Sequence, residues 1–268
     1  MTQDFITTMR RESISKHLEE SRMVLEFGPY IRPTILASDK KDYFVIDCFS
    51  QDELKQYAQS NDEDNGNIPV TNFLIDPLSN TIRPDLIGKF DLIIANHVFE
   101  HLIDPFRWLH EWEKSLIPGG KMILCIPDKK QSFDKFRSDT SFSHLLSDFF
   151  LGGQTSLPEH LIDCALLYSS NSMDTEVELK RRLSKEFLEK ALDSYQPGLH
   201  VHVFQYEYFI DTILKPFLLL GHTDLDLVDS GLLESIGEFY VVLSKSKPSW
   251  DSVSSERFFH RSADSHDG

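Results

Sequence analysis

The stretch FDLIIANHVFEHL at residues 90–102, followed by LIPGGKMILCIPD at residues 116–128, decides the fold class. Each stretch holds a short apolar run, LIIA in the first and MILCI in the second, with turn residues on either side. Such runs are typical of strands buried on both faces, as in a parallel sheet. Asp104 and Pro105 predict the start of a helix reaching Leu116, because they supply an N-cap side chain and a preset first turn. The two stretches therefore predict a strand-helix-strand unit.

The same alternation extends in both directions along the chain. Apolar runs of strand length are separated by stretches with helical spacing, and turns are expected at 118–120 and 231–237. This pattern predicts an α/β fold with a doubly wound, mainly parallel sheet, in which ligands bind outside the carboxyl ends of the strands. Strands are predicted at 23–27, 43–46, 73–75, 92–95, 122–126, 224–228 and 238–243, and helices at 52–59, 104–116 and 206–220.

The alternation stops after the fifth predicted strand. Residues 128–198 hold no convincing strand but several amphipathic stretches, such as 175–192, which predict a helical insertion or cap. We expect a single domain over 1–245 with this insertion inside it. Residues 246–268 are rich in Ser, Asp and His and are expected to form a flexible tail.

Length and charge narrow the functional classes. A chain of 268 residues fits one large domain, and its net charge of −16 repels phosphate backbones, which disfavours duplex nucleic acid as a partner. No apolar run is long enough for a membrane span, and the N-terminal stretch has no signal-peptide pattern, so we expect a cytoplasmic protein. The three cysteines are widely separated, which disfavours a disulfide framework. The basic pair Arg10-Arg11 is expected on a solvated helix face.

Two strand ends carry residues that suit a nucleotide-like ligand. Gly28 follows the first strand and permits a sharp turn and close approach of the backbone. Asp47 ends the second strand and could accept hydrogen bonds from both hydroxyls of a ribose. The later glycines of a G-x-G-x-x-G turn are replaced by Tyr30 and Pro33. An Asp in this position is also common as a turn or cap residue, so both interpretations stay open.

Together with the strand-end acid, the FD-apolar-apolar, EH-apolar and L-x-PGG patterns of residues 23–128 resemble the class I S-adenosylmethionine-dependent methyltransferases. The resemblance implies a Rossmann-like seven-stranded sheet with a helical insertion after the fifth strand, an enzyme that transfers a methyl group, and S-adenosylmethionine as cofactor. The resemblance implies that the backbone around Glu26 and Gly28 holds the methionine end, Asp47 the ribose and Asp76 the adenine edge, with Asn96 and His97 beneath the methyl group. For Asp76, a simple turn ahead of Pro77 is an equal alternative to this role.

Three further segments are similar to a bacterial subgroup associated with the assembly of glycans or cell-surface polysaccharides. They are LEFGPYIRP at 25–33, CIPDKKQSFDKFR at 125–137 and HVHVFQYEYF at 200–209. This likeness implies a small or medium acceptor such as a sugar hydroxyl. The chain departs from the subgroup at His202, where Trp is usual, and at Cys164, where His is expected.

A hydroxyl acceptor calls for a general base, and the subgroup likeness points to His200. Asp128 closes the fifth strand and could orient the acceptor or the base. The alternatives are a packed, hydrogen-bonded histidine at 200 and a helix cap at 128. Asp134 and Arg137 are candidates for contacting substrate, or for pairing with each other.

Three competing interpretations remain. His97, Glu100 and His101 spell H-x-x-E-H, but the motif directly follows a buried strand and has no evident third ligand, so neither metal-dependent proteolysis nor a bound metal is predicted. A nicotinamide-dependent oxidoreductase would also place an acid on the second strand, although the glycine-rich turn is missing. The third is a methyltransferase-like partner subunit without activity. The oligomeric state is not predicted.

Overall fold

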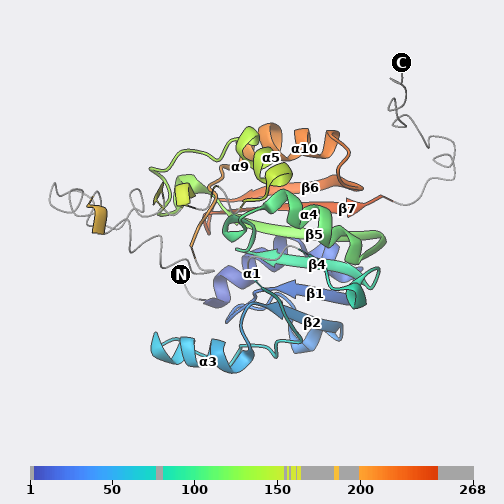
Figure 1. Ribbon diagram of the computed structural model, residues 1–268. Coiled ribbons are helices and arrows are strands. Elements are labelled where there is room, and N and C mark those ends of the chain that lie inside the picture. Colours follow the sequence, from blue (N-terminus) through green and yellow to red (C-terminus); the bar gives the residue numbers. More distant parts are fainter. Residues whose placement is uncertain are drawn as a thin grey trace, which may run out of the picture.

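A computed structural model describes residues 3–76, 81–153, 156, 158–160, 162–163, 184–186 and 199–246. Within these residues, seven strands form one sheet in the order β3-β2-β1-β4-β5-β7-β6 (Figure 1). β1 to β5 run parallel, whereas β7 is antiparallel to both of its neighbours, β5 and β6. The strands are β1 (Met23–Phe27), β2 (Asp42–Asp47), β3 (Phe73–Leu74), β4 (Phe90–Asn96), β5 (Leu116–Pro127), β6 (Leu225–Leu233) and β7 (Glu238–Lys245).

Helices cover both faces of the sheet, and side-chain alternation along the strands separates the two layers. On β1, Leu25 and Phe27 belong to the larger core, which includes side chains from α4, α5 and the helical stretch 206–219. Val24 belongs to the smaller core with Ile14 and Leu18 from the N-terminal helices. The helices are α1 (Gln3–Ser13), α2 (Ser15–Glu19), α3 (Gln51–Ser60), α4 (Pro105–Trp112), α5 (Phe142–Leu151), α9 (Tyr206–Tyr208), a π-helix (Phe209–Leu214) and α10 (Lys215–Leu219).

The helix after β4 begins where the sequence predicts it. The Asp104 carboxylate accepts a hydrogen bond from the Arg107 N–H at 2.9 Å, and Pro105 takes the first helical position. The aromatic side chains of α4 are buried, and Trp108 and Trp112 pack edge-on against Phe27 of β1 with ring centroids 4.9 and 4.6 Å apart. Figure 1 shows α5, α9 and α10 gathered at the end of the sheet that carries β6 and β7, with α3 at the opposite end.

The α/β Rossmann-like fold and the seven predicted strands are confirmed, but both predicted glycine turns are wrong in part. Residues 118–120 lie inside β5, where a Cβ on Gly120 would come within 2.9 Å of the Ile117 carbonyl oxygen. Gly231 lies inside β6, opposite Tyr240, and a Cβ there would meet the Tyr240 ring at 2.7 Å. These two glycines therefore allow close packing within the sheet rather than a change of direction.

The structure also corrects the expectation for Arg10. This side chain is 5% exposed and takes part in a buried ion pair with Glu238, so the basic pair is not a solvated face. The helix expected at 175–192, the third cysteine, Cys164, and residues 247–268 lie outside the described residues. Among the helices that the structure describes, none combines the length and the apolar character needed to cross a bilayer.

Candidate active site

The order of the strands reverses between β1 and β4, and the carboxyl ends of such neighbours form the crevice where doubly wound sheets bind ligands. Gly28, directly after β1, has φ +54 and donates its N–H to the Ile46 carbonyl of β2 at 3.0 Å. A Cβ at Gly28 would lie 3.6 Å from Val98 Cγ2 and 4.0 Å from Asp47 Oδ2. The ends of β1, β2 and β4 therefore meet at Gly28, as predicted.

The acid that ends β2 and the acid that follows β3 both lie near Cys48. Asp47 accepts a hydrogen bond from the Phe49 N–H at 3.0 Å. Burial raises the pKa of the Asp47 carboxyl and outweighs this hydrogen bond, which lowers it. The Ile75 N–H donates to the Asp47 carbonyl at 3.0 Å, which brings the exposed Asp76 to the same edge. Burial raises the pKa of the Cys48 thiol to about 11, and the charges of Asp47 and Asp76 add to this rise. Both predicted acids thus border one site.

Glu26 and Asn96 lie in contact on the face of the sheet that α1 and α2 cover. The Glu26 carboxylate accepts hydrogen bonds from the Thr34 N–H at 3.0 Å, from the Tyr43 hydroxyl at 2.7 Å and from Asn96 Nδ2 at 3.4 Å. Asn96 Nδ2 also donates to Thr34 Oγ1 at 2.6 Å. Burial raises the pKa of the Glu26 carboxyl. These bonds hold the loop that follows Gly28, so the two side chains shape the crevice through this loop.

His97 links the end of β4 to Glu238 at the start of β7 and, through Glu238, to α1. It has the uncommon φ of +53, and its N–H donates to the Cys125 carbonyl of β5 at 2.8 Å. Its ring nitrogens lie 3.4 Å from Glu100 Oε1 and 2.9 Å from Glu238 Oε1. Arg10 of α1 donates two hydrogen bonds to Glu238, each of 2.7 Å. The sequence carries no local signal for this contact, because its members lie on α1, the β4 end and β7.

The pKa of the Glu238 carboxyl departs strongly from its ordinary value. Burial disfavours its charged form, but hydrogen bonds from His97 and Arg10 outweigh this and lower the pKa of the carboxyl to about 2. The carboxylate therefore stays ionised and keeps α1 attached to the start of β7.

His200 forms a buried dyad with Asp134. Its Nδ1 lies 2.6 Å from Asp134 Oδ2, and because a carboxylate only accepts, Nδ1 carries a proton. In the neutral imidazole, Nε2 then carries the lone pair. Arg137 donates to Asp134 at 2.9 Å and to the His200 carbonyl at 2.7 Å. Burial opposes ionisation of Asp134, but hydrogen bonds from His200 and Arg137 hold the pKa of its carboxyl below its usual range. Asp134 and Arg137 are therefore an ion pair, and they orient His200.

The Nε2 atom of His200 faces a polar group to which the H-x-x-E-H motif contributes Glu100 and His101. His200 Nε2 lies 3.8 Å from Glu100 Oε1, and His101 Nε2 lies at the same distance from it. His101 Nδ1 bonds to the Leu199 carbonyl at 2.8 Å. Both Glu100 oxygens are buried, and the described part of the chain offers them no hydrogen-bond partner. Glu100, His101 and His200 could hold a metal ion, because one ligand atom from each lies within 4.8 Å of the others.

This group takes Glu100 and His101 from the H-x-x-E-H motif and adds His200, whereas the motif's first histidine, His97, is not part of it. His200 follows His101 by 99 residues, so no spacing rule could have found it. The motif itself lies at the end of β4 and on the 3₁₀ turn Phe99–His101 rather than on an α-helix. It therefore lacks the helical face that a zinc-protease motif requires.

Asp128 is engaged as a cap. It is 1% exposed, its Oδ1 accepts the Lys130 N–H at 2.8 Å, and its Oδ2 accepts the Tyr206 N–H at 3.3 Å. The side chain thus stabilises the turn after β5 and the start of α9. This geometry favours the cap interpretation over a role in orienting the acceptor.

Comparisons with known proteins place this geometry in a family. A family model described as a methyltransferase domain matches residues 6–165, more than half of the chain. The comparison with curated proteins found no match. A solved structure described as a zinc-dependent alcohol dehydrogenase from Rhodobacter sphaeroides shares 14% identity over 90% of each chain with a TM-score of 0.51, a likeness that shows the fold alone.

Two methyltransferase structures are also similar to the chain. A S-adenosylmethionine-dependent methyltransferase from Aquifex aeolicus shares 13% identity over 91% of this chain and 99% of its own, with a TM-score of 0.42. The 1,6-didemethyltoxoflavin-N1-methyltransferase of Burkholderia thailandensis, solved with S-adenosylhomocysteine, shares 12% identity over 89% of this chain and 78% of its own, with a TM-score of 0.46. On the family match, the chain belongs to the methyltransferase domain family and is a class I methyltransferase with S-adenosylmethionine as its cofactor.

Proposed function

We propose that this methyltransferase acts on a hydroxyl oxygen of a small or medium acceptor and that His200 is its general base. The buried Asp134–His200 dyad is the observation that carries the proposal, because it holds Nε2 as a proton acceptor facing away from Asp134. The cofactor supplies a methyl group already activated by positive sulfur, so the protein supplies alignment, exclusion of water and a base. The bound cofactor would supply the methyl group to the acceptor oxygen, and His200 Nε2 would take up the hydroxyl proton.

The cofactor side of this proposal rests on the meeting of three strand ends. Gly28 lets the backbone approach closely, and a side chain there would fill the space towards Asp47 and Val98. Asp47 keeps carboxylate lone pairs beyond its hydrogen bonds from the Phe49 and Cys48 N–H groups, which suits the two ribose hydroxyls. We assign the methionine end to the backbone at Glu26 and Gly28, the ribose to Asp47, the adenine edge to Asp76 and the floor beneath the methyl group to Asn96 and His97.

The acceptor side is polar. His97, Glu100, His101 and His200 surround the position that His200 Nε2 faces, and Glu100 is 1% exposed. Buried carboxylate and imidazole groups suit an acceptor that brings several hydroxyls, because each unsatisfied group gains a hydrogen bond on binding. This lining and the likeness of residues 125–137 and 200–209 to the glycan-associated subgroup support a sugar hydroxyl as the acceptor.

The test measures S-adenosylhomocysteine release from S-adenosylmethionine with a panel of monosaccharides and nucleotide sugars. We expect His200→Ala to lower kcat about 10²- to 10⁴-fold without changing the affinity for S-adenosylhomocysteine. Asp134→Asn should produce a smaller loss and displace the acid limb of the pH profile, because it changes the partner of His200 Nδ1. The control His110→Ala removes a histidine whose Nδ1 bonds to the His222 carbonyl, and it should leave kcat unchanged.

Unimpaired turnover in His200→Ala would eliminate this histidine as the base. A chain that binds S-adenosylhomocysteine but methylates none of the sugars would instead support the inactive partner subunit over the proposed acceptor.

A further inference from the structure

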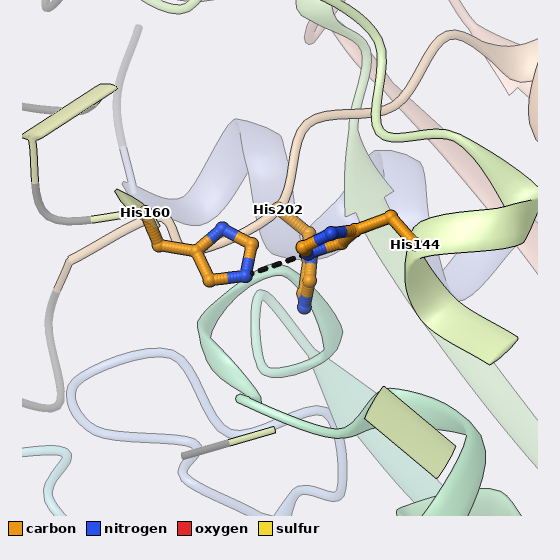
Figure 2. A group of neighbouring side chains, drawn as sticks. All are labelled: His144, His160 and His202. Carbon is orange, nitrogen blue, oxygen red and sulfur yellow. Dashed lines mark hydrogen bonds between the residues drawn. The ribbon is translucent and has the colours of Figure 1, made fainter. Parts of the chain in front are cut away.

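The side chains of three histidines from separate segments lie close together at α5. His144 comes from α5, His160 from the helical residues 158–160, and His202 from the segment that returns to the sheet. One ring nitrogen from each lies within 4.8 Å of the others, and the Nε2 atoms of His144 and His160 are 2.8 Å apart (Figure 2). Figure 2 shows the His202 ring beside the two nitrogens that the dashed line joins. None of the three serves the methyl transfer proposed above.

A carboxylate lies beside two of these histidines, His144 and His160. Asp148 lies one helical turn after His144 and is 3% exposed. Its Oδ2 lies 3.2 Å from His144 Nε2 and 3.9 Å from His160 Nε2. Its other oxygen, Oδ1, accepts the Ser156 hydroxyl at 2.7 Å, which orients the carboxylate towards the histidines.

Hydrogen bonds among these four residues and their described neighbours leave two of their buried polar atoms without a partner. His202 is fully buried and its Nε2 lies 3.3 Å from the Ile103 carbonyl, so Nε2 carries the ring proton and Nδ1 a lone pair. Within the described residues, His202 Nδ1 and Asp148 Oδ2 have no hydrogen-bond partner. An imidazole nitrogen and a carboxylate oxygen are therefore buried without a described hydrogen-bond partner beside the His144–His160 pair, an arrangement that is costly without a cation.

We propose that His144, Asp148, His160 and His202 bind one divalent transition metal ion, with Zn²⁺ as the ion that suits them. Three imidazoles and a carboxylate form the four-coordinate nitrogen and oxygen set that zinc accepts. Tetrahedral ligands about 2.0–2.1 Å from zinc lie about 3.3 Å from one another, and the separations of 2.8, 3.2 and 3.9 Å among His144, His160 and Asp148 bracket this value. One ring nitrogen of His202 lies within 4.8 Å of those of His144 and His160. The bonds from His202 Nε2 to Ile103 and from Ser156 to Asp148 are the outer contacts that orient metal ligands.

The position of the site gives it a structural role. It joins α5, residues 158–160 and the segment 199–204, which are far apart in the sequence. The His202 N–H donates to the Glu100 carbonyl at 2.9 Å, so the same segment is attached to the end of β4. A bound ion would stabilise the part of the chain that follows β5 against the sheet and hold the segment that carries His200.

The experiment uses the full chain without an affinity tag, stripped of metal by a chelator. Titration with Co²⁺ should give one bound equivalent with the visible absorption of a four-coordinate site, and Zn²⁺ should displace it. His144→Ala and Asp148→Asn should each weaken binding at least about 100-fold, because even outer contacts of metal ligands are worth 10- to 100-fold. His144 is the partly exposed member, so its removal is the least disruptive to folding.

Two control variants make the assignment specific. His110→Ala, on the neighbouring helix α4, should bind Co²⁺ as the wild type does. His101→Ala removes a member of the group around Glu100 and should also leave the stoichiometry and the spectrum unchanged. Binding of S-adenosylhomocysteine, measured for every variant, reports folding independently of the metal.

The proposal is overturned if the folded wild type binds no Co²⁺ or Zn²⁺ at micromolar concentrations. It is equally overturned if His144→Ala retains the wild-type affinity, or if His101→Ala abolishes binding while His144→Ala does not. The first two results leave the proposed methyl transfer untouched, because the metal titration involves no acceptor. Binding that depends on His101 would instead place the ion in the group with Glu100 and His200 and would also count against His200 as a free base.

Discussion

The crevice at the strand ends and the acceptor side beside it are built in different ways. In the crevice, Gly28 directly follows β1 and Asp47 is the last residue of β2. Backbone hydrogen bonds within the sheet fix the positions of both residues. On the acceptor side, which comprises His97, Glu100, His101, Glu238 and the Asp134–His200 dyad, acidic and histidine side chains from distant segments contact one another. The comparison teaches that the backbone positions the groups proposed for the cofactor, whereas side-chain pairs position the proposed base.

The largest loss of stability is expected when a buried charge is removed from the acceptor side. Glu238→Gln leaves Arg10 buried without its anion, and we expect a loss of about 3–5 kcal/mol in the free energy of unfolding, measured in urea. Replacing both partners by methionine should recover much of this loss, because no isolated charge then remains. Equal stability of Glu238→Gln and the wild type would show that the ion pair does not hold α1.

The same pair predicts a pH dependence. Because the pKa of Glu238 is about 2 in the folded chain and about 4.3 in an unfolded one, its contribution is complete above this ordinary value. It is lost as the pH falls from about 5 towards 2. The stability difference between wild type and Glu238→Gln should therefore be largest near neutrality and shrink in acid, in urea titrations at several pH values.

A smaller effect is expected in the crevice, where the backbone matters most. Gly28→Ala forces a side chain into the left-handed region and should cost about 1–2 kcal/mol of unfolding free energy. Gly88→Ala is a matched control, since Gly88 has φ +64 but no heavy atom within 4 Å of its added Cβ. Both variants should lose similar stability, but only Gly28→Ala should weaken the binding of S-adenosylhomocysteine. Equal binding by the two would place the ligand away from Gly28.

The smallest effect concerns the cap between the two regions. Asp128→Ala removes the acceptor of the Lys130 and Tyr206 N–H groups and should cost about 1 kcal/mol of unfolding free energy. Asp128→Asn keeps one side-chain oxygen and should cost less. If Asp128→Ala instead abolished turnover at unchanged stability, the residue would act on the acceptor rather than as a cap.

Much of the crevice could be predicted from sequence, because strand ends follow from short apolar runs and the turn residues beside them. Gly28 and Asp47 lie where that pattern places them. The glycines of β5 and β6 misled the prediction, since Gly120 and Gly231 permit close packing and this need is visible only in three dimensions. The helical pattern after β5 predicted an insertion but not its contacts.

The acceptor side could be predicted only in fragments. The H-x-x-E-H motif identified Glu100 and His101, but the approach of His200 depends on how the chain returns after the insertion. Arg10 was expected in solvent because its neighbours in sequence are polar, and only its pairing with Glu238, 228 residues later, accounts for its burial. Residues joined by such tertiary contacts leave no periodic signal in a single sequence.

Calorimetric titration with S-adenosylhomocysteine tests the central claim, that the meeting strand ends hold the adenosyl cofactor through Asp47. Asp47→Ala removes the carboxylate that we propose accepts two charge-assisted hydrogen bonds from the ribose, so it should weaken binding at least about 100-fold. Asp42→Ala removes an exposed acid from the opposite end of the same strand and should bind as the wild type does. Wild-type affinity in Asp47→Ala would contradict the account.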